Sequence, residues 1–309
     1  MSLTVVGSIA FDSVKTPFGE RERMLGGSAV HFSLAASFFS EVRIVGPVGE
    51  DFGGEQLAVL ERRGVETGDI ERLPEGETFF WRGHYDFDLN TAHTEETRLG
   101  VFADFAPKLS QASKDAGTLF LANIQPQLQR QVRGQCADAR LVALDSMNLW
   151  IETARDPLLA AIAEVDCVIL NDAEIRELTA EPNLARAART LMGLGPRMVV
   201  AKRGEYGAAL FTADGFFALP GLPLEDVRDP TGAGDSFAGG FLGYLDSQGG
   251  EPDEAALRRA MGYGTVLASF NVEQFGTERV AALTREEVDD RLRSLHRMTQ
   301  FEAIPQPAR

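Results

Sequence analysis

The chain has 309 residues, of which 44% are hydrophobic and 25% charged, a composition typical of a globular protein with a large core. Its net charge of -16 argues against a nucleic-acid partner, because such binders need clustered Lys and Arg to neutralise phosphates. No apolar run could span a bilayer, and residues 1–7 lack a signal-peptide pattern, so we expect no membrane partner and a cytoplasmic location. Cys136 and Cys167 lack metal-ligand spacing and are expected to be buried small hydrophobes.

Apolar segments rich in β-branched residues alternate with helical segments along the chain. Strands are predicted at residues 3–9 and 42–48, and helices at residues 27–39 and 55–63. The strand pattern resumes at residues 118–122, 141–144, 167–170 and 198–201, each beside a helical segment, and helices at 253–270 and 284–296 follow. This alternation predicts a doubly wound α/β fold, in which a mostly parallel sheet is flanked by helices.

Two segments interrupt the alternation, at about residues 11–25 and 71–105, and the second contains an aromatic, strand-like run at residues 78–87. We expect them to pair as a small inserted β-sheet, a lid that excludes water from a site beside it. The alternative is two ordinary surface hairpins. The predicted organisation is a single domain over residues 1–300 that includes this lid, with a C-terminal tail at 301–309. An exposed lid edge could also pair across a homodimer.

The most informative motif lies at residues 229–241, where small residues run directly into a helix. Gly232, Ala233 and Gly234 leave backbone N–H groups uncovered at the positive end of a helix dipole, which predicts an anion hole. Asp235, in the first helical turn, could accept a proton from a hydroxyl that attacks the terminal phosphate of ATP. Alternatively, this carboxylate only complements the dipole and the glycines permit tight packing. The density of polar residues around the glycines favours a site.

Residues 229–240 closely resemble the C-terminal signature of the PfkB family of ribokinase-like carbohydrate and nucleoside kinases. The resemblance implies an ATP-binding transferase that moves the terminal phosphate of ATP to a hydroxyl of a small-molecule acceptor. Asp235 would be the catalytic base and the backbone of residues 232–234 the anion hole. The resemblance further implies Mg²⁺ as a cofactor. Asp229 and Thr231 match two usual ligands of a monovalent cation in this family, so a requirement for K⁺ stays open.

Two N-terminal motifs resemble the family's acceptor site. Gly26 and Gly27 open a helix in the manner of the second family signature, and His31 stands where members commonly carry Asn. This His could hydrogen-bond the acceptor or simply pack against the sheet. Asp12 resembles the family Asp that binds acceptor hydroxyls, and we expect it at the carboxyl end of the first strand, where open α/β sheets bind ligands. The alternative for Asp12 is a simple turn residue.

Three further motifs resemble the family's metal and nucleotide elements. Asn171 and Glu174 follow a predicted strand and match an Asn-x-x-Glu element that helps to place magnesium, mainly through water, although the same spacing is a helix capping box. Four residues are candidates for nucleotide binding. Lys202, Gly204 and Gly207 belong to a Lys-x-Gly-x-x-Gly element, and Asn271 lies nearer the C-terminus. The Lys could bind phosphate or only pair with a nearby acid.

Other functions fit the sequence less well. A nicotinamide-dependent oxidoreductase would need Gly-x-Gly-x-x-Gly after the first strand, and residues 7–12 lack the second and third glycines. A noncatalytic sugar- or nucleoside-binding relative would be expected to lose Asp235 or the anion hole. The acceptor, a ribonucleoside or a sugar, is left open. Aromatic lid residues that could stack on a base favour a nucleoside, although they could instead form the lid's own core or a dimer contact: Phe79, Phe80, Trp81, Tyr85 and Phe87.

Overall fold

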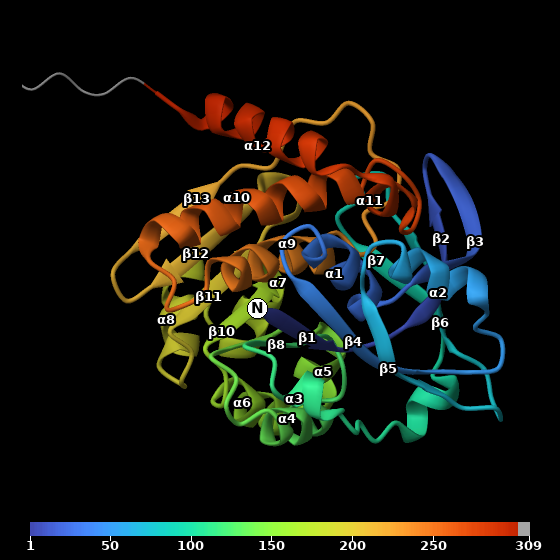
Figure 1. Ribbon diagram of the computed structural model, residues 1–309. Helices are drawn as coiled ribbons and strands as arrows, with labels where there is room; N and C mark the ends of the chain where they lie inside the picture. The colour runs from blue at the N-terminus through green and yellow to red at the C-terminus, as the bar shows by residue number, and fades with distance from the viewer. Residues whose placement is uncertain (302–309) are drawn as a thin grey trace, which may run out of the picture.

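A nine-stranded sheet forms the centre of the protein in a computed structural model that describes residues 1–301 (Figure 1). The strand order is β13-β12-β11-β10-β9-β8-β1-β4-β5. Neighbours are parallel except β11–β12 and β12–β13, which are antiparallel. The strands are β1 (Ser2–Val6), β4 (Glu41–Val48), β5 (Glu66–Arg72), β8 (Thr118–Leu121), β9 (Leu141–Leu144), β10 (Cys167–Asn171), β11 (Met198–Lys202), β12 (Ala208–Thr212) and β13 (Phe216–Leu219).

Helices cover both faces of this sheet because its strands alternate apolar residues between two cores. In β10, Cys167 and Ile169 join one hydrophobic cluster while Val168 and Leu170 join the other. The first face carries α1 (Ser28–Ala36), α2 (Gly54–Glu61), α9 (Ala233–Gln248), α10 (Glu254–Asn271), α11 (Glu278–Ala282) and α12 (Arg285–Thr299). The second carries α3 (Gln111–Lys114), α4 (Pro126–Gln135), α5 (Asn148–Thr153), α6 (Arg155–Ile162), α7 (Asp172–Thr179) and α8 (Leu184–Met192). The predicted doubly wound α/β fold is confirmed.

The predicted lid is a separate four-stranded sheet in the order β3-β2-β6-β7. Its strands are β2 (Ala10–Thr16), β3 (Gly19–Gly26), β6 (Phe79–Tyr85) and β7 (Ala92–Arg98), and only β2 and β6 are parallel. The expected limits at 71–105 were too wide: residues 71–72 end β5 of the main sheet, and residues 100–104 form the short 3-10 helix η1 (Gly100–Asp104).

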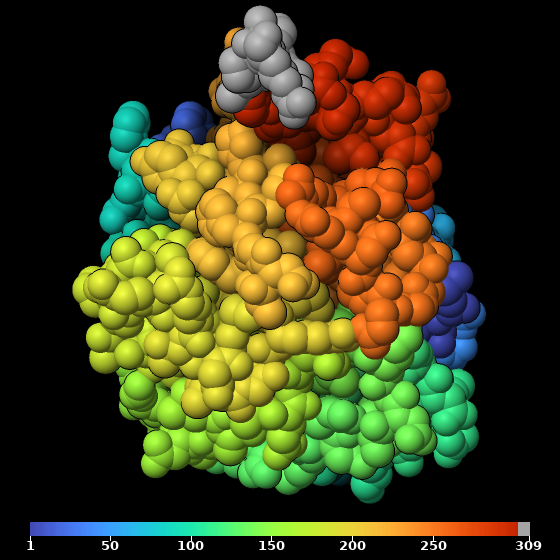
Figure 2. Space-filling model, turned by 90° about the vertical axis from the view of Figure 1, so that its left-hand side faces the viewer, coloured from blue at the N-terminus to red at the C-terminus, as the bar shows by residue number. Residues whose placement is uncertain are grey.

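Two other expectations are corrected. The strand predicted at 3–9 ends at Val6, and the chain re-enters an extended conformation at Ala10 in the lid, so Asp12 lies on β2 and not on the first strand of the main sheet. The β12–β13 hairpin, which was not predicted, closes one edge of the sheet beside the second 3-10 helix, η2 (Gly204–Tyr206). Figure 2 shows the face where this hairpin lies against α10. At this contact, the guanidinium of Arg258 lies over the ring of Phe217.

Cys136 and Cys167 are both buried and unbonded, as expected. Among the described residues, no helix is both long and apolar enough to cross a membrane. The expected tail at 301–309 lies outside the described residues except for Phe301.

Candidate active site

The N-terminus of α9 opens on a left-handed residue, Gly232, with φ 76° and ψ 0°. A Cβ there would lie 2.3 Å from the ring of His31, so both the backbone and the space require glycine. The N–H of Ala233 donates to the carbonyl of Pro230 at 3.1 Å. Gly234 N–H, by contrast, has no backbone partner among the described residues, as is usual in the first turn of a helix. Of the three backbone N–H groups predicted to form the anion hole, that of Ala233 is therefore already bonded within the protein.

The side chain of Asn271, at the end of α10, joins three segments beneath that turn. Its Nδ2 donates to the carbonyl of Thr231 at 2.7 Å, and its Oδ1 accepts from Ser236 Oγ at 3.0 Å. The same Oδ1 lies 3.0 Å from Nδ1 of His31, and Asn271 is fully buried. Its position corrects the expectation of a direct nucleotide contact, because all of these polar atoms hold the α9 turn in place.

His31 is buried at 2% exposure, and its hydrogen bond to Asn271 fixes its tautomer. Since Asn271 Oδ1 can only accept, Nδ1 of His31 must carry the proton, and Nε2 is left as an acceptor. Nε2 is buried and has no partner among the described residues. Burial lowers the pKa of this imidazole to about 4, although the hydrogen bond to Asn271 acts in the opposite direction. The ring therefore stays neutral at physiological pH and can receive a hydrogen bond at Nε2.

Asp229 is fully buried, and both of its carboxylate oxygens accept backbone hydrogen bonds. Oδ1 accepts from the N–H of Thr231 at 2.9 Å, and Oδ2 accepts from the N–H of Gly276 at 3.0 Å. Burial raises its pKa in spite of these bonds. The carboxylate thus ties the loop before α9 to the segment after α10.

Asp235 is half-buried in the first turn of α9, close to a buried ion pair. Nζ of Lys202, at the end of β11, donates to Oδ2 of Asp145 at 2.6 Å, and a Cβ on Gly234 would lie 3.0 Å from the same Nζ. Burial and the negative charge of Asp145 raise the pKa of Asp235 to about 7, against the opposing effect of Lys202. A carboxylate with a pKa near neutrality can exchange a proton at neutral pH.

The ammonium of Lys202 faces several acids at once. Burial alone would lower its pKa, but the carboxylates of Asp145, Glu174 and Asp235 raise it. The pairing of this Lys with an acid is present in the structure, and its charge lies beside the predicted anion hole; its binding of phosphate stays a prediction.

Asn171 and Glu174 form a capping box at the start of α7, the structural alternative considered for them. Asn171 Oδ1 accepts from the N–H of Glu174 at 2.8 Å, and Glu174 Oε2 accepts from the N–H of Asn171 at 2.8 Å. Burial and the charge of Asp145 raise the pKa of Glu174 to about 7, although Lys202 opposes them. The second carboxylate oxygen of Glu174 remains a hard donor beside Asp145, a donor set that suits Mg²⁺ with several waters.

On the lid side, Asp12 faces the start of α1. Its Oδ2 accepts from the N–H of Gly27 at 3.3 Å, and a Cβ on Gly26 would lie only 1.9 Å from that oxygen. Gly27 has φ 93°, and a Cβ there would lie 2.4 Å from the carbonyl oxygen of Ser8. Burial, together with the charges of Asp229 and Asp235, raises the pKa of Asp12 to about 7. The two glycines thus allow this carboxylate to approach the helix.

The lid sheet has distinct inner and outer faces. Trp81 lies beside Asp12 in the β2–β6 pairing, and two residues further on, a Cβ at Gly83 would lie 2.4 Å from the Trp81 ring. The indole N–H donates to Thr94 Oγ1 at 3.1 Å, and the Tyr85 hydroxyl lies 3.2 Å from Thr231 Oγ1, which links the lid to the α9 loop.

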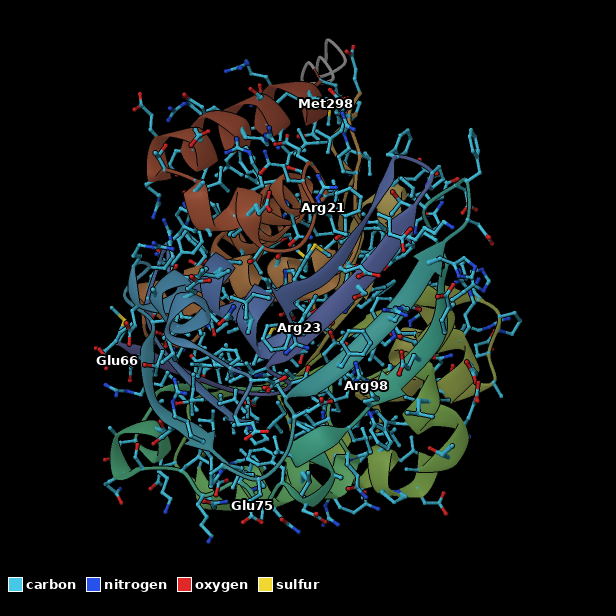
Figure 3. All side chains as sticks on the ribbon, turned by 90° about the vertical axis from the view of Figure 1, so that its right-hand side faces the viewer. Arg21, Arg23, Glu66, Glu75, Arg98 and Met298 are labelled. Carbon is cyan, nitrogen blue, oxygen red and sulfur yellow. The ribbon has the colours of Figure 1, made fainter. Side chains whose placement is uncertain are left out.

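Of the aromatic residues expected on one stacking surface, two lie elsewhere. Phe80 is buried on the outer face beneath the guanidinium of Arg98, which Figure 3 labels together with Arg23, another outer-face residue. Phe87 is 89% exposed, beyond the end of β6. The interpretation of a five-residue platform is therefore corrected: Trp81 is the broad inner-face ring, with Phe79 packed edge-on against Phe102.

A cavity of about 560 Å³ lies between Gly204–Tyr206, residues 221–224 with Val227, and helices α9 and α10. The predicted nucleotide residues Lys202, Gly204 and Gly207 line it, as does Gly234 of the anion hole. Its other wall comes from the lid, at Asp88, Leu89 and Asn90 of the β6–β7 loop. The cavity therefore connects directly to the anion hole and suits an adenine nucleotide in size.

Sequence reasoning missed two members of this site, Asp145 and Tyr85. Asp145 directly follows the predicted strand at 141–144, so it gave the same end-of-strand signal that identified Asn171 and Lys202. Tyr85 was noted only as an aromatic surface, and nothing in its sequence neighbours points to Thr231.

Comparison with known proteins places the chain in a family. Residues 103–282 match the pfkB family of carbohydrate kinases. The cytidine kinase of Thermococcus kodakarensis is 31% identical over 266 residues, which cover 84% of this chain and 92% of that protein. In fold, the chain resembles Burkholderia thailandensis nucleoside kinase in complex with ADP-inosine (TM-score 0.76, 21% identity, 95% of each chain). It also resembles an E. coli ribokinase II in complex with ATP and Mg²⁺ (TM-score 0.79, 18% identity, 95% and 99% of the two chains). With this coverage and its signature motifs, the chain belongs to the pfkB family and is a ribokinase-like small-molecule kinase.

Proposed function

We propose that the protein is an ATP-dependent ribonucleoside kinase that transfers the terminal phosphate of ATP to a ribose hydroxyl. The observation that carries this proposal is the position of Trp81 beside Asp12 on the inner face of the lid. A nucleoside site needs two groups on one surface: a carboxylate that accepts hydrogen bonds from the ribose hydroxyls, and an aromatic ring that stacks on the base. A free sugar has less use for the indole plane, because it carries no base to stack there. The similarity to a cytidine kinase supports the same choice.

Asp235 is proposed as the general base. Its carboxylate accepts the proton of the acceptor hydroxyl while that oxygen attacks the terminal phosphorus of ATP, the bond from phosphorus to the bridging oxygen breaks, and ADP leaves. The N–H groups at the start of α9 and the Lys202 ammonium stabilise the negative charge on the transferred phosphoryl group. Proximity of this charge to Gly234 supports the assignment.

His31 is proposed to bind the acceptor through Nε2, in place of the Asn common in the family. Its neutral ring offers a lone pair in a buried position, where an unmet acceptor costs roughly 1 to 3 kcal/mol. A ribose hydroxyl that donates to Nε2 removes that cost. On the nucleotide side, Lys202, Gly204 and Gly207 are proposed to contact ATP in the 560 Å³ cavity.

Two cations are proposed with different support. Mg²⁺ would be held mainly through water by Glu174, Asn171 and Asp145, and it would neutralise charge on the phosphates of ATP. For K⁺, Asp229 and Thr231 remain the proposed ligands. Asp229 already accepts two backbone N–H bonds, so it would use the second lone pairs of its oxygens. Hard oxygen donors are present in both places.

The wider expectations also stand as proposals. We propose one kinase domain over residues 1–300, a cytoplasmic location and a homodimer that pairs through the lid. The available lid edges are β3 and β7. Both edges carry charged residues, which discourage edge-to-edge pairing: Glu20, Arg21, Glu22 and Arg23 on β3, and Glu95, Glu96 and Arg98 on β7. The β3 edge also offers the apolar pair Met24 and Leu25, and it is the proposed dimer contact.

The test offers purified protein ATP, Mg²⁺ and K⁺ with cytidine, adenosine, inosine, guanosine, ribose, fructose and 2-keto-3-deoxygluconate as acceptors. We expect at least one nucleoside to be phosphorylated with a kcat/KM that exceeds that of every free sugar. A Trp81→Ala variant should lose this preference by roughly 10-fold or more, because a base stacked on an aromatic ring contributes about 1 to 3 kcal/mol. Efficient phosphorylation of a sugar with inert nucleosides would refute the acceptor assignment.

A further inference from the structure

Two histidines and two carboxylates gather at the base of the β6–β7 loop of the lid. His84 and His93 are directly opposite each other in the antiparallel pairing, and their rings stack with centroids 5.0 Å apart. Asp86 follows His84 by two residues. One ligand atom from each of these three residues lies within 4.8 Å of the others. The hairpin register, not chance proximity of loops, brings the three together.

Each imidazole is also held by a carboxylate. His84 Nδ1 lies 2.7 Å from Glu95 Oε1, and His93 Nε2 lies 2.8 Å from Asp86 Oδ2. Glu95 reaches His84 because a register shift between Arg82 and Gly83 leaves it unpaired in the ladder. At His84, the carboxylate of Glu95 on one ring nitrogen orients the imidazole, the arrangement found around metal-bound His.

We propose that His84, Asp86 and His93 bind one divalent transition-metal ion, with Zn²⁺ as the representative, and that Glu95 orients His84. Two imidazoles and one carboxylate are ligands that suit Zn²⁺ and leave its fourth position to water. In a tetrahedral site with bonds of about 2.0 to 2.2 Å, ligand atoms lie about 3.3 Å apart. The three ligand atoms now lie within 4.8 Å of one another, and rotation of these half-buried or exposed side chains would bring them to the tetrahedral spacing.

The local charge favours a cation. Asp86 and Glu95 carry two negative charges, against one positive charge on Lys15, which neighbours His84 in the β2–β6 pairing. Arg82, the preceding residue of the same row, lies within 4.0 Å of Glu22 and Glu96, whose charges offset its own. The site lies on the outer face of the lid, in the row along β6 that includes Phe80 and Arg82, whereas Asp12 belongs to the inner face. The ion is therefore distinct from the one that accompanies ATP.

Binding there would tie together the two strands that lead into the loop at residues 86–91. Asp88, Leu89 and Asn90 of this loop line the nucleotide cavity, and Tyr85, between two of the ligands, contacts Thr231. The lid hairpin is the teal pair of strands in Figure 3. A metal cross-link at its base would reduce opening of the loop that walls the cavity.

The experiment titrates chelator-treated full-length protein with Zn²⁺ in the absence of nucleotide and Mg²⁺. His84→Gln and His93→Gln are compared with His296→Gln, which removes another exposed histidine at the far end of the chain. We expect one Zn²⁺ per chain, at least 10-fold weaker binding in the first two variants and unchanged binding in the third. Glu95→Gln should weaken binding by about 10- to 100-fold while it keeps the stoichiometry.

A second measurement locates the ion. Zn²⁺ should slow amide hydrogen exchange at residues 86–92 of the wild type and of His296→Gln, and should leave it unchanged in His93→Gln. Circular dichroism checks that each variant is folded. The proposal would be overturned if the wild type bound Zn²⁺ no more tightly than His84→Gln. It would also be overturned if His296→Gln lost as much Zn²⁺ affinity as His84→Gln. So would tight binding without any change in exchange at this loop.

Discussion

Replacement of Asp235 by Asn tests the proposed base most directly. The carboxamide keeps the shape of the side chain but cannot accept a proton, so kcat should fall by roughly 10²- to 10⁴-fold, or about 3 to 5 kcal/mol of activation free energy. Fold and ATP affinity should be retained, because this half-buried side chain has no side-chain hydrogen-bond partner among the described residues.

The pH dependence gives a second, independent readout. With its pKa raised to about 7 by burial and by Asp145, Asp235 is protonated below neutrality and ionised above it. The kcat of the wild type should therefore fall about tenfold per pH unit below pH 7 and level off above it. Asp235→Asn should lose this limb, and this separates the base from Asp12, whose pKa is raised to a similar value.

Steady-state kinetics at saturating ATP and acceptor, repeated across pH, provide the assay. Asp226→Asn is the matched control, since this side chain is 83% exposed and forms an ion pair with Arg228 at 3.8 Å. Turnover of Asp235→Asn within a few-fold of wild type, or an unchanged acidic limb, would refute the role of Asp235 as base.

Three further substitutions examine the surrounding groups. Asp12→Ala should raise the acceptor KM by about 10- to 100-fold, because contacts to a charged group are lost, and should change ATP affinity little. A loss of ATP affinity alone would mean that the acceptor and nucleotide subsites are reversed. Gly232→Ala should lower both Tm and kcat, since its Cβ would lie 2.3 Å from the His31 ring at φ 76°, and wild-type values of both would contradict this geometry. Lys202→Met should move the acidic limb of kcat to higher pH, because its charge lowers the pKa of Asp235, whereas a limb at an unchanged pH would show that this charge does not act on the base.

Signals that are local in sequence predicted much of this molecule. The small residues at the start of α9 and the polar residues at the ends of β10 and β11 could be recognised by their type and by their position. The α/β alternation predicted the fold because parallel strands need long crossovers and carry apolar residues on both faces. Asp145 stands in the same kind of position and could have been included on the same ground.

What could not be predicted depends on contacts between distant segments. Residues 3–9 and 10–16 are both extended and apolar, and periodicity does not tell which sheet each joins, so Asp12 was assigned to the wrong strand. Asn271 is an amide in a helical segment, and only its position beneath the α9 turn reveals that its polar atoms are used internally. The cross-strand pair of His84 and His93 similarly depends on register, which the sequence of one strand does not carry.

The hydrogen bond between His31 and Asn271 joins residues that are 240 positions apart. During synthesis at about 5 to 20 residues per second, Asn271 is added roughly 12 to 48 s after His31. Until then the imidazole and the α9 turn lack the amide that connects them, and α1, whose residues are all buried, lacks the helix that covers it. Contacts of such long range slow folding. The nascent chain therefore has a long interval in which an apolar helix is exposed, and phosphotransfer activity can emerge only after Asn271 has left the ribosome.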